Sequence, residues 1–344
     1  VDALAGELPE LRKTVQIAGS HTAAEGHDWA AMMENSLPVP APVFDTATDV
    51  AAILYTSGTT GKPKGAMLTH RNLAANTASV FRVMQLQPGK DTFLVVLPLF
   101  HSFAATAGML TPLLYGAAIA PLPRFEPASV VDTITAVQAT IFLGVPSMYT
   151  VLLRLPDDAA DKLASLRFCV SGGASMPVDV LRRFEEKFGK KIYEGDGPTE
   201  CSPVTCVNPI DGGRRIGSVG LPVPGVEMSI RDEQMNELPD NEIGEICCRG
   251  DSMMKGYWNQ PEETAQAFHG DWFKTGDLGY RDDDGYFYII DRKKDLVIVN
   301  GMNVYPRVIE EVLYQHPSIR EAAVVGEPDR LHGEIPVAYL SIKD

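Results

Sequence analysis

The sequence is poor in several features that would place it in a familiar class of protein. It has no apolar run of about eighteen residues or more, so no segment is predicted to span a membrane. Basic residues are the minority, 30 against 45 acidic ones. The resulting net charge of −15 disfavours nucleic acid as a partner and leaves at most peripheral contact with an anionic membrane.

Cysteine and targeting signals are also scarce. The first residues, VDALAGELPELRK, contain neither the basic nor the apolar part of a signal peptide, so we expect none. No CxxC pair occurs, and the histidines offer no spacing that would complete a zinc site. We therefore expect the five cysteines to be buried free thiols in a reducing cytoplasm.

With 344 residues, 45% of them apolar, the chain is long enough for more than one domain. Between residues 50 and 221, apolar strand-like runs such as 91–99, 139–145 and 166–172 alternate with helical patterns at 127–138 and 176–189. This alternation predicts an α/β fold with mainly parallel sheets flanked by helices.

The pattern changes twice further along. Short strands separated by Asn, Asp and Gly turns predict a small β-rich unit over 222–293. A strand at 296–300, a helix opening at Pro306 and strands at 321–327 and 336–344 then predict a small α+β domain over 294–344 that is incomplete. We expect residues 1–221 to form the α/β core, itself incomplete at its N-terminus.

The stretch YTSGTTGKPKG, residues 55–65, combines many hydroxyls with very little side-chain bulk between two strand-like segments. Hydroxyls and glycine backbone N–H groups suit a small anion, and Lys64 supplies a positive charge. The groups expected to bind phosphate are Thr56, Ser57, Gly58, Thr59, Thr60, Gly61 and Lys64. Pro63 after Lys62 excludes a Walker P-loop, and no GxGxxG fingerprint is present. A solvated turn is the alternative.

This stretch resembles the phosphate-loop signature of the acyl-adenylate-forming (AMP-binding) family, which includes acyl-CoA synthetases, firefly luciferase and the adenylation domains of peptide synthetases. Further segments resemble the family's motifs in the family's order. Taken singly, each also fits a tight turn, a surface carboxylate or a salt-bridged hairpin. The ordered series favours the nucleotide interpretation.

The resemblance implies a site for ATP and AMP. Gly172, Gly173 and Ala174 of SGGASMP would line the adenine, together with Glu194, Gly195, Asp196 and Gly197 of EGDGPTECSP. Thr199 would contact the α-phosphate, and Thr59 and Glu200 would hold Mg²⁺, a cation that prefers oxygen ligands. At Asp196 the family commonly has an aromatic residue that stacks on adenine, and an acid forfeits that stacking.

The later motifs imply the remaining contacts. In the segment 272–295, Asp277 would accept the ribose hydroxyls, Arg292 would contact ribose and phosphate, and Lys294 would be the hinge of the C-terminal domain. His101 of LPLFHSFAATAG would lie near the reacting carboxylate, and Gly301 of NGMNVYP would make room for coenzyme A. Gly144, Val145 and Tyr149 would add to the wall of the acyl pocket, although they could equally be core.

The implied activity is ATP-dependent activation of a carboxylic acid, in particular a medium- or long-chain fatty acid, through acyl-AMP to a coenzyme A thioester. Lys64, Thr199, Glu200 and His101 would be its catalytic residues. One alternative is an amino-acid or aryl-acid adenylation domain, which would need an acid where His101 and Ser102 follow Phe100. The other is a catalytically silent nucleotide-binding protein. Acyl chain length and oligomeric state are not readable from these residues.

Members of the family carry a longer segment ahead of the phosphate loop and end with a Gly-Lys element. Neither has a counterpart here. We therefore expect a truncated chain that retains nucleotide binding but forms the adenylate poorly.

Overall fold

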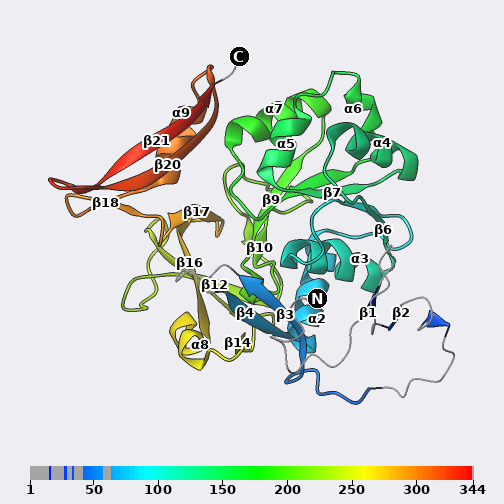
Figure 1. Ribbon diagram of the computed structural model, residues 1–344, viewed down its shortest axis with the longest axis horizontal. Coiled ribbons are helices and arrows are strands. Elements are labelled where there is room, and N and C mark those ends of the chain that lie inside the picture. The colour runs from blue at the N-terminus through cyan, green and yellow to red at the C-terminus, as the bar shows by residue number, and fades with distance from the viewer. Residues whose placement is uncertain (1–14, 17–26, 29–32, 35–41, 57–62, 343–344) are drawn as a thin grey trace. The chain divides into compact units, whose positions relative to one another are not determined.

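The computed structural model describes residues 15–16, 27–28, 33–34, 42–56 and 63–342 (Figure 1). The chain divides into two compact units, residues 1–44 and 45–344. In the first unit, β1 (Val15–Gln16) pairs in parallel with β2 (His27–Asp28). All of the sheets and helices that concern function lie in the second unit.

The centre of the second unit is a seven-stranded sheet with the order β11-β10-β9-β8-β7-β5-β6. Its parallel strands are β5 (Thr92–Val95), β6 (Ala118–Pro121), β7 (Ile141–Gly144), β8 (Phe168–Ser171) and β9 (Ile192–Asp196). The short strands β10 (Cys206–Val207) and β11 (Leu221–Pro222) continue it in antiparallel fashion. The prediction of a mainly parallel α/β sheet is confirmed.

Helices cover both faces of this sheet, as Figure 1 shows. One face carries α4 (Pro127–Val137), α5 (Pro146–Leu152), α6 (Ala159–Lys162) and α7 (Val178–Phe188). The other carries α2 (His70–Val83), the π-helix η2 (Phe103–Leu110) and α3 (Thr111–Leu114). Side chains alternate between the faces, so Phe142 packs with the first group of helices while Ile141 and Leu143 pack with the second. Burial on both sides explains why the strand sequences are continuously apolar.

The local sequence fixes several helix ends. Thr69 and Asn72 form a reciprocal capping box at the start of α2. Glu126 accepts hydrogen bonds from the first backbone N–H groups of α4, which begins with Pro127. Gly189 ends α7 in the left-handed conformation at φ 63°.

Antiparallel sheets follow and flank this core. β3 (Val50–Thr56) and β4 (Lys64–Thr69) form the hairpin of the predicted phosphate loop, and β14 (Gly256–Tyr257) pairs with β4. A five-stranded sheet contains β12 (Val226–Arg231), β13 (Gly244–Gly250), β16 (Trp272–Arg281), β15 (Phe268–His269) and β17 (Phe287–Arg292). The 3₁₀ turn η3 (Thr199–Cys201) and the helix α8 (Pro261–Ala267) complete this region. The predicted hairpin across DDDG is the β16–β17 pair.

The last part of the chain is a four-stranded sheet with one helix. The sheet has the order β19-β18-β21-β20 and consists of β18 (Val297–Val299), β19 (Met302–Val304), β20 (Ile319–Asp329) and β21 (Gly333–Ile342). The helix α9 (Pro306–Tyr314) opens at Pro306, as predicted. The domain boundaries at 221 and 293 stay a prediction.

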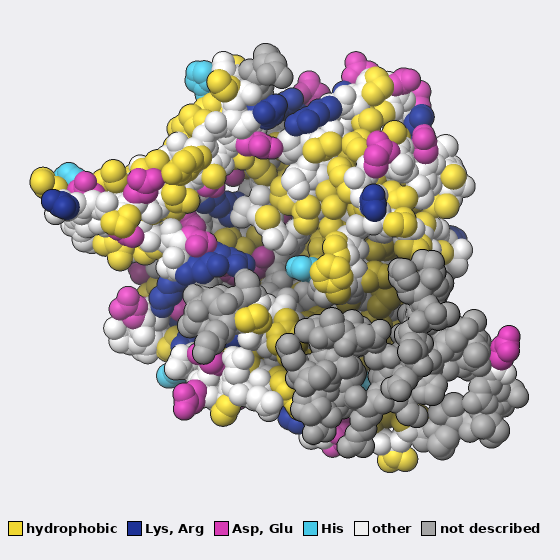
Figure 2. All heavy atoms as spheres, in the orientation of Figure 1, with side chains coloured by type: hydrophobic (Ala, Val, Ile, Leu, Met, Phe, Trp, Pro, Cys, Tyr) yellow, Lys and Arg dark blue, Asp and Glu magenta, His cyan; other side chains and the backbone are white. Residues whose placement is uncertain are grey.

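Three further features bear on the expectations from composition. All five cysteines are buried and free. Among the described residues, no helix combines the length and apolarity needed to cross a bilayer. On the face that Figure 2 shows, Lys and Arg side chains are interspersed with Asp and Glu side chains. Individual guanidinium groups commonly have carboxylate partners, as Arg215 has in Asp282 and Asp284.

Candidate active site

The phosphate-loop hairpin places Thr56 and Lys64 opposite each other at the ends of its two strands. The connecting residues 57–62 lie outside the described residues, and with them the predictions for Ser57, Gly58, Thr59, Thr60 and Gly61. The described part of the site therefore begins with the residues on either side of this connection.

Lys64 lies in a partly buried position between an acid and an aromatic ring. Its ammonium forms an ion pair with the carboxylate of Glu263 in α8, and the Lys64 side chain is only 12% exposed. The Nζ atom also lies 5.3 Å from the centre of the Tyr257 ring. The chain thus holds a cation next to the predicted phosphate loop by two separate contacts.

Glu200 is buried and faces the same hairpin. Its Oε1 accepts a hydrogen bond from the hydroxyl of Tyr257 at 2.8 Å and a long one from Thr56 Oγ1 at 3.5 Å. The structure therefore brings Thr56, Lys64 and Glu200 together, with Tyr257 in contact with both Lys64 and Glu200.

This arrangement fits a magnesium ion that is shared with a nucleotide. No group of three or more His, Cys, Asp or Glu side chains among the described residues could hold a metal by itself. Mg²⁺ commonly takes one or two carboxylates and completes its shell with water and substrate phosphates. Glu200, with hydroxyl groups beside it, provides a donor set of that kind.

Thr199 precedes Glu200 and contacts the segment that was predicted to border the acyl pocket. Its Oγ1 lies 3.0 Å from Ser102 Oγ, so the two hydroxyls share a hydrogen bond. His101, the preceding residue, is exposed, and its Nδ1 accepts the N–H of Phe103 at 3.3 Å. Tyr149 is fully buried and donates its hydroxyl to the carbonyl of Val170, which makes it a core residue.

The two segments predicted to line the adenine lie side by side at the ends of β8 and β9. Gly172 lies close to the carbonyl of Gly195 and to the ring of Phe103. Gly173 and Ala174 are exposed at the start of this turn. Gly197 has no room for a side chain, because an added Cβ would meet the carbonyl of Pro203 at 1.7 Å.

A set of buried acids lies at this end of the site. Burial raises the pKa of Glu194 to about 7, although its Oε1 accepts the N–H of Met176 at 3.0 Å. The other oxygen, Oε2, is buried and has no hydrogen-bond partner among the described residues. Burial also raises the pKa of Asp196, against the opposing effects of the Gly197 N–H and of Arg292.

Asp277 belongs to the same electrostatic set. Its Oδ1 lies 3.1 Å from Arg292 Nε. Burial and then the charge of Asp196 raise the pKa of Asp277, and Arg292 opposes that shift. Arg307 of α9 also acts electrostatically on Glu194 and Asp196. A charged ligand with hydroxyl groups would therefore meet both acids and guanidinium groups here.

Two predicted site residues belong neither to the cluster around Glu200 nor to the one around Asp277. Lys294 is exposed just after β17, and Gly301 is exposed in the β18–β19 turn at φ 78°. Their proposed roles, as a hinge and in coenzyme A binding, stay predictions.

Sequence reasoning missed Tyr257, Glu263, Ser102 and Arg307. Tyr257 and Glu263 belong to the segment GYWNQPEET, in which nothing distinguishes a site residue from a surface one. Glu263 lies 199 residues from its partner Lys64 along the chain. A pairing of that kind has no local signal.

The match to known protein families covers most of the chain. Residues 2–258 match the family described as AMP-binding enzyme, and residues 308–344 match the AMP-binding enzyme C-terminal domain.

Known proteins align with the chain over most of its length. The long-chain-fatty-acid–CoA ligase of Bacillus subtilis is 42% identical over 321 residues, covering 92% of this chain and 57% of the relative. The sulfoacetate–CoA ligase of Cupriavidus necator is 40% identical over 320 residues, covering 90% of this chain and 62% of the relative. The ATP-bound structure of MatB from Rhodopseudomonas palustris superposes with a TM-score of 0.84 at 39% identity, over 88% of this chain and 60% of that one. The chain thus spans less than two thirds of the length of each.

Proposed function

Because this chain belongs to the AMP-binding enzyme family, we propose that it activates a carboxylic acid with ATP. The reaction would pass through acyl-AMP and end in a thioester with coenzyme A. The observation that carries this proposal is the grouping of Thr56, Lys64 and Glu200 beside the phosphate-loop hairpin.

Pyrophosphate is the leaving group of the first step, so this grouping is where charge must be dispersed. Lys64 and the hydroxyl of Thr56 would face the departing phosphates. Glu200 would hold Mg²⁺, which when bound neutralises phosphate charge. No protein nucleophile is required, and the contribution of the chain is positioning and electrostatic stabilisation.

The other end of the nucleotide would meet the acids and arginines around Asp277. A carboxylate has two oxygens with which to accept the two ribose hydroxyls, and Arg292 already lies 3.1 Å from that carboxylate. Thr199 would contact the α-phosphate, with the hydroxyl of Ser102 fixing its orientation. His101 would lie near the reacting carboxylate.

We further propose a medium- or long-chain fatty acid as the substrate and the cytoplasm as the location. The fatty-acid ligase of Bacillus subtilis supports this substrate class. The sulfoacetate ligase shows that a similar sequence serves a small, polar acid, so the acid must be identified by experiment.

The test is a binding experiment followed by an activity experiment. Calorimetry would compare AMP with nonhydrolysable mimics of acyl-adenylates that carry acyl groups from acetyl to palmitoyl. The proposal predicts that a fatty acyl mimic binds at least about tenfold more tightly than AMP, since the acyl group adds buried apolar area. Acid-dependent exchange of labelled pyrophosphate into ATP would then identify the acid. Equal affinity for AMP and every mimic would instead identify a nucleotide-binding protein without an acyl site.

A further inference from the structure

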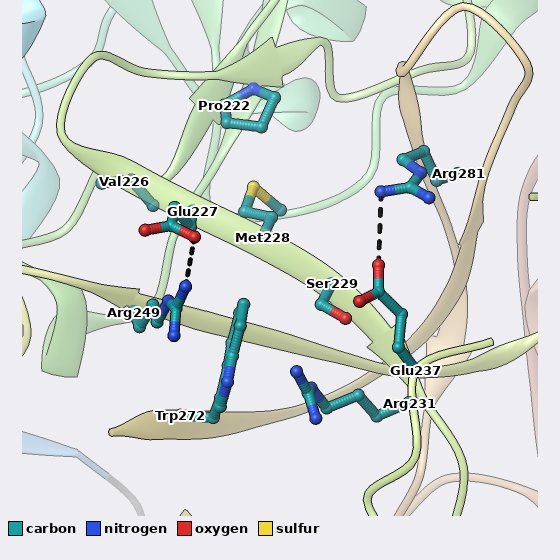
Figure 3. Close-up of a pocket in the computed structure, with 10 residues that line it drawn as sticks. All are labelled: Pro222, Val226, Glu227, Met228, Ser229, Arg231, Glu237, Arg249, Trp272 and Arg281. Atoms are coloured by element: carbon teal, nitrogen blue, oxygen red, sulfur yellow. Dashed lines mark hydrogen bonds and ion pairs between the residues drawn. The ribbon is translucent and has the colours of Figure 1, made fainter. Parts of the chain in front are cut away.

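A cavity of about 500 Å³ lies against the five-stranded sheet, at its edge strand β12, and shares no residue with the nucleotide site (Figure 3). Glu227, Ser229 and Arg231 occupy alternate positions of β12 and line this cavity. Arg249 of β13 and Trp272 of β16 line it from the neighbouring strands.

Trp272 is enclosed by two guanidinium groups. The Arg231 guanidinium carbon lies 4.2 Å and that of Arg249 4.6 Å from the centre of the ring. Figure 3 shows the guanidinium of Arg231 extending toward Trp272, with Ser229 close by on β12. Stacking on an indole restrains a guanidinium while leaving its N–H groups free to donate. The cavity thus contains a positioned cation.

The other arginines of the cavity have carboxylate partners. Arg249 Nη2 lies 2.6 Å from Glu227, and Arg281 pairs with Asp240 at 2.5 Å and with Glu237 at 3.6 Å.

Arg231 differs from them. Its Nη1 donates to the carbonyl of Met235 at 2.7 Å, but no carboxylate among the described residues lies within ion-pair distance of it. Glu245, which is opposite Arg231 in the ladder, is bound instead by Lys293 at 3.1 Å and by the N–H of Gly276 at 3.2 Å. Glu237, which is opposite Arg231 in an isolated bridge, pairs with Arg281 at 3.6 Å, so Arg231 has no ion-pair partner among the described residues.

Two polar atoms at this place, one of them in the Arg231 guanidinium itself, lack hydrogen-bond partners among the residues that the structure describes. They are Arg231 Nε and Ser229 Oγ, both buried, and Ser229 as a whole is only 2% exposed. Leaving a buried donor unpaired is costly, so such groups in native proteins usually have a partner. The Nε–H of a guanidinium without a carboxylate partner and a hydroxyl two residues away on the same strand are donors that suit an anionic oxygen.

We propose that this cavity binds the oxyanion group of a small molecule, a carboxylate or a phosphate, with Arg231 Nε and Ser229 Oγ as its donors. Arg249 and Arg281 are paired with Glu227, Glu237 and Asp240, so Arg231 supplies the guanidinium that a single anionic group would meet. The proposal does not depend on the ligase activity, because none of these residues belongs to the nucleotide site.

The test uses Trp272 as a reporter in the full chain carrying Trp29→Phe and Trp258→Phe. Inorganic phosphate and acetate are titrated separately at constant ionic strength while Trp272 fluorescence is recorded. We expect a saturable change with at least one of the two anions, and the tighter one identifies the ligand as a phosphate or a carboxylate. Absence of saturation with both would overturn the proposal and leave water as the partner of the two donors.

Three variants distinguish a built site from general attraction. Arg231→Met should weaken binding at least about tenfold and Ser229→Ala about threefold, the losses expected for a charged and a neutral hydrogen bond. The double variant Arg249→Met with Glu227→Gln is the matched control, since it removes the other guanidinium on the same indole together with its carboxylate partner but leaves both donors, and it should stay within about twofold. Equal weakening by Arg231→Met and by this double variant would contradict the assignment.

A second measurement on the unsubstituted chain is independent of how well these variants fold. The Nε–H resonance of Arg231 should shift with the same saturation curve as the fluorescence. A resonance that stays unmoved while Trp272 responds would also contradict the assignment.

Discussion

Tyr257 donates its hydroxyl to Glu200 across 2.8 Å, and its ring lies 5.3 Å from the ammonium of Lys64. One side chain on β14 therefore touches both the proposed magnesium ligand and the proposed phosphate-binding cation. β14 is paired with β4 of the phosphate-loop hairpin, so one sheet fixes Tyr257 and Lys64. Glu200 lies in η3, and its carbonyl accepts the N–H of Met254, just ahead of β14, at 2.7 Å.

Tyr257→Phe removes the hydroxyl contact with Glu200 and keeps the ring contact with Lys64, so it tests the two contacts independently. The ring beside Lys64 remains, while Glu200 loses its best hydrogen-bond donor. Because a hydrogen bond to a ligand carboxylate orients it, we expect the magnesium concentration for half-maximal nucleotide binding to rise about tenfold or more. Calorimetry with ATP over a series of magnesium concentrations measures this. AMP binding without the metal is the control and should be unchanged; an unchanged magnesium requirement would show that the contact is only structural.

Glu263→Gln tests whether the acid competes with phosphate for Lys64. The carboxylate forms an ion pair with Lys64 in the nucleotide-free structure, so its neutralisation should free the ammonium for the nucleotide. We expect the dissociation constant of ATP to fall about threefold to tenfold and that of adenosine to stay constant. Glu262→Gln, an exposed neighbour on α8, is the matched control. A weaker affinity for ATP in Glu263→Gln would mean that the acid positions the lysine rather than competing for it.

Glu194→Gln should reduce the dependence of stability on pH. Burial raises the pKa of this carboxyl from 4.5 to about 7. Between these two pH values the folded state keeps a proton that the unfolded chain loses, so the free energy of unfolding falls as the pH rises. The resulting stabilisation is complete below about pH 4.5 and disappears as the pH rises through about 7. Its size is on the order of 3 kcal/mol.

Urea unfolding at several pH values across this window measures the effect. The decline in unfolding free energy should be smaller in Glu194→Gln than in the unsubstituted chain. Glu186→Gln, an exposed acid on α7, should leave the decline unchanged. If the unfolding free energies of all three proteins fell in parallel with pH, the pKa of Glu194 would not be raised in the folded state.

Asp196→Tyr should supply the aromatic surface that resemblance to the family leads one to expect at this position. A ring stacked on adenine is expected to tighten AMP binding about threefold to tenfold. Asp196→Asn is the comparison, because it removes the charge without adding a ring. If asparagine tightens binding as much as tyrosine does, repulsion by the acid rather than the missing ring limits affinity.

Much of this architecture could be predicted from short stretches of sequence. Continuous apolar runs such as 141–144 gave strands buried on both faces, and Pro306 marked the start of α9. The strand-like segments on either side of the phosphate loop and the tight turn after β8 were also predicted.

The contacts that join these segments could not be predicted in the same way. Tyr257 and Glu200 are 57 residues apart, and each would pass for an ordinary core or surface residue in its own segment. The unpaired charge of Arg231 likewise becomes visible only when the partners of the arginines around it are known. Such relationships are properties of tertiary packing, which local patterns do not encode.

The most direct test of the proposed site is a crystal structure of this chain with a nonhydrolysable ATP analogue and Mg²⁺. We expect a magnesium ion on the Glu200 carboxylate, with the β- and γ-phosphates against Thr56 and Lys64. A triphosphate bound elsewhere, or a magnesium ion without contact to Glu200, would contradict it.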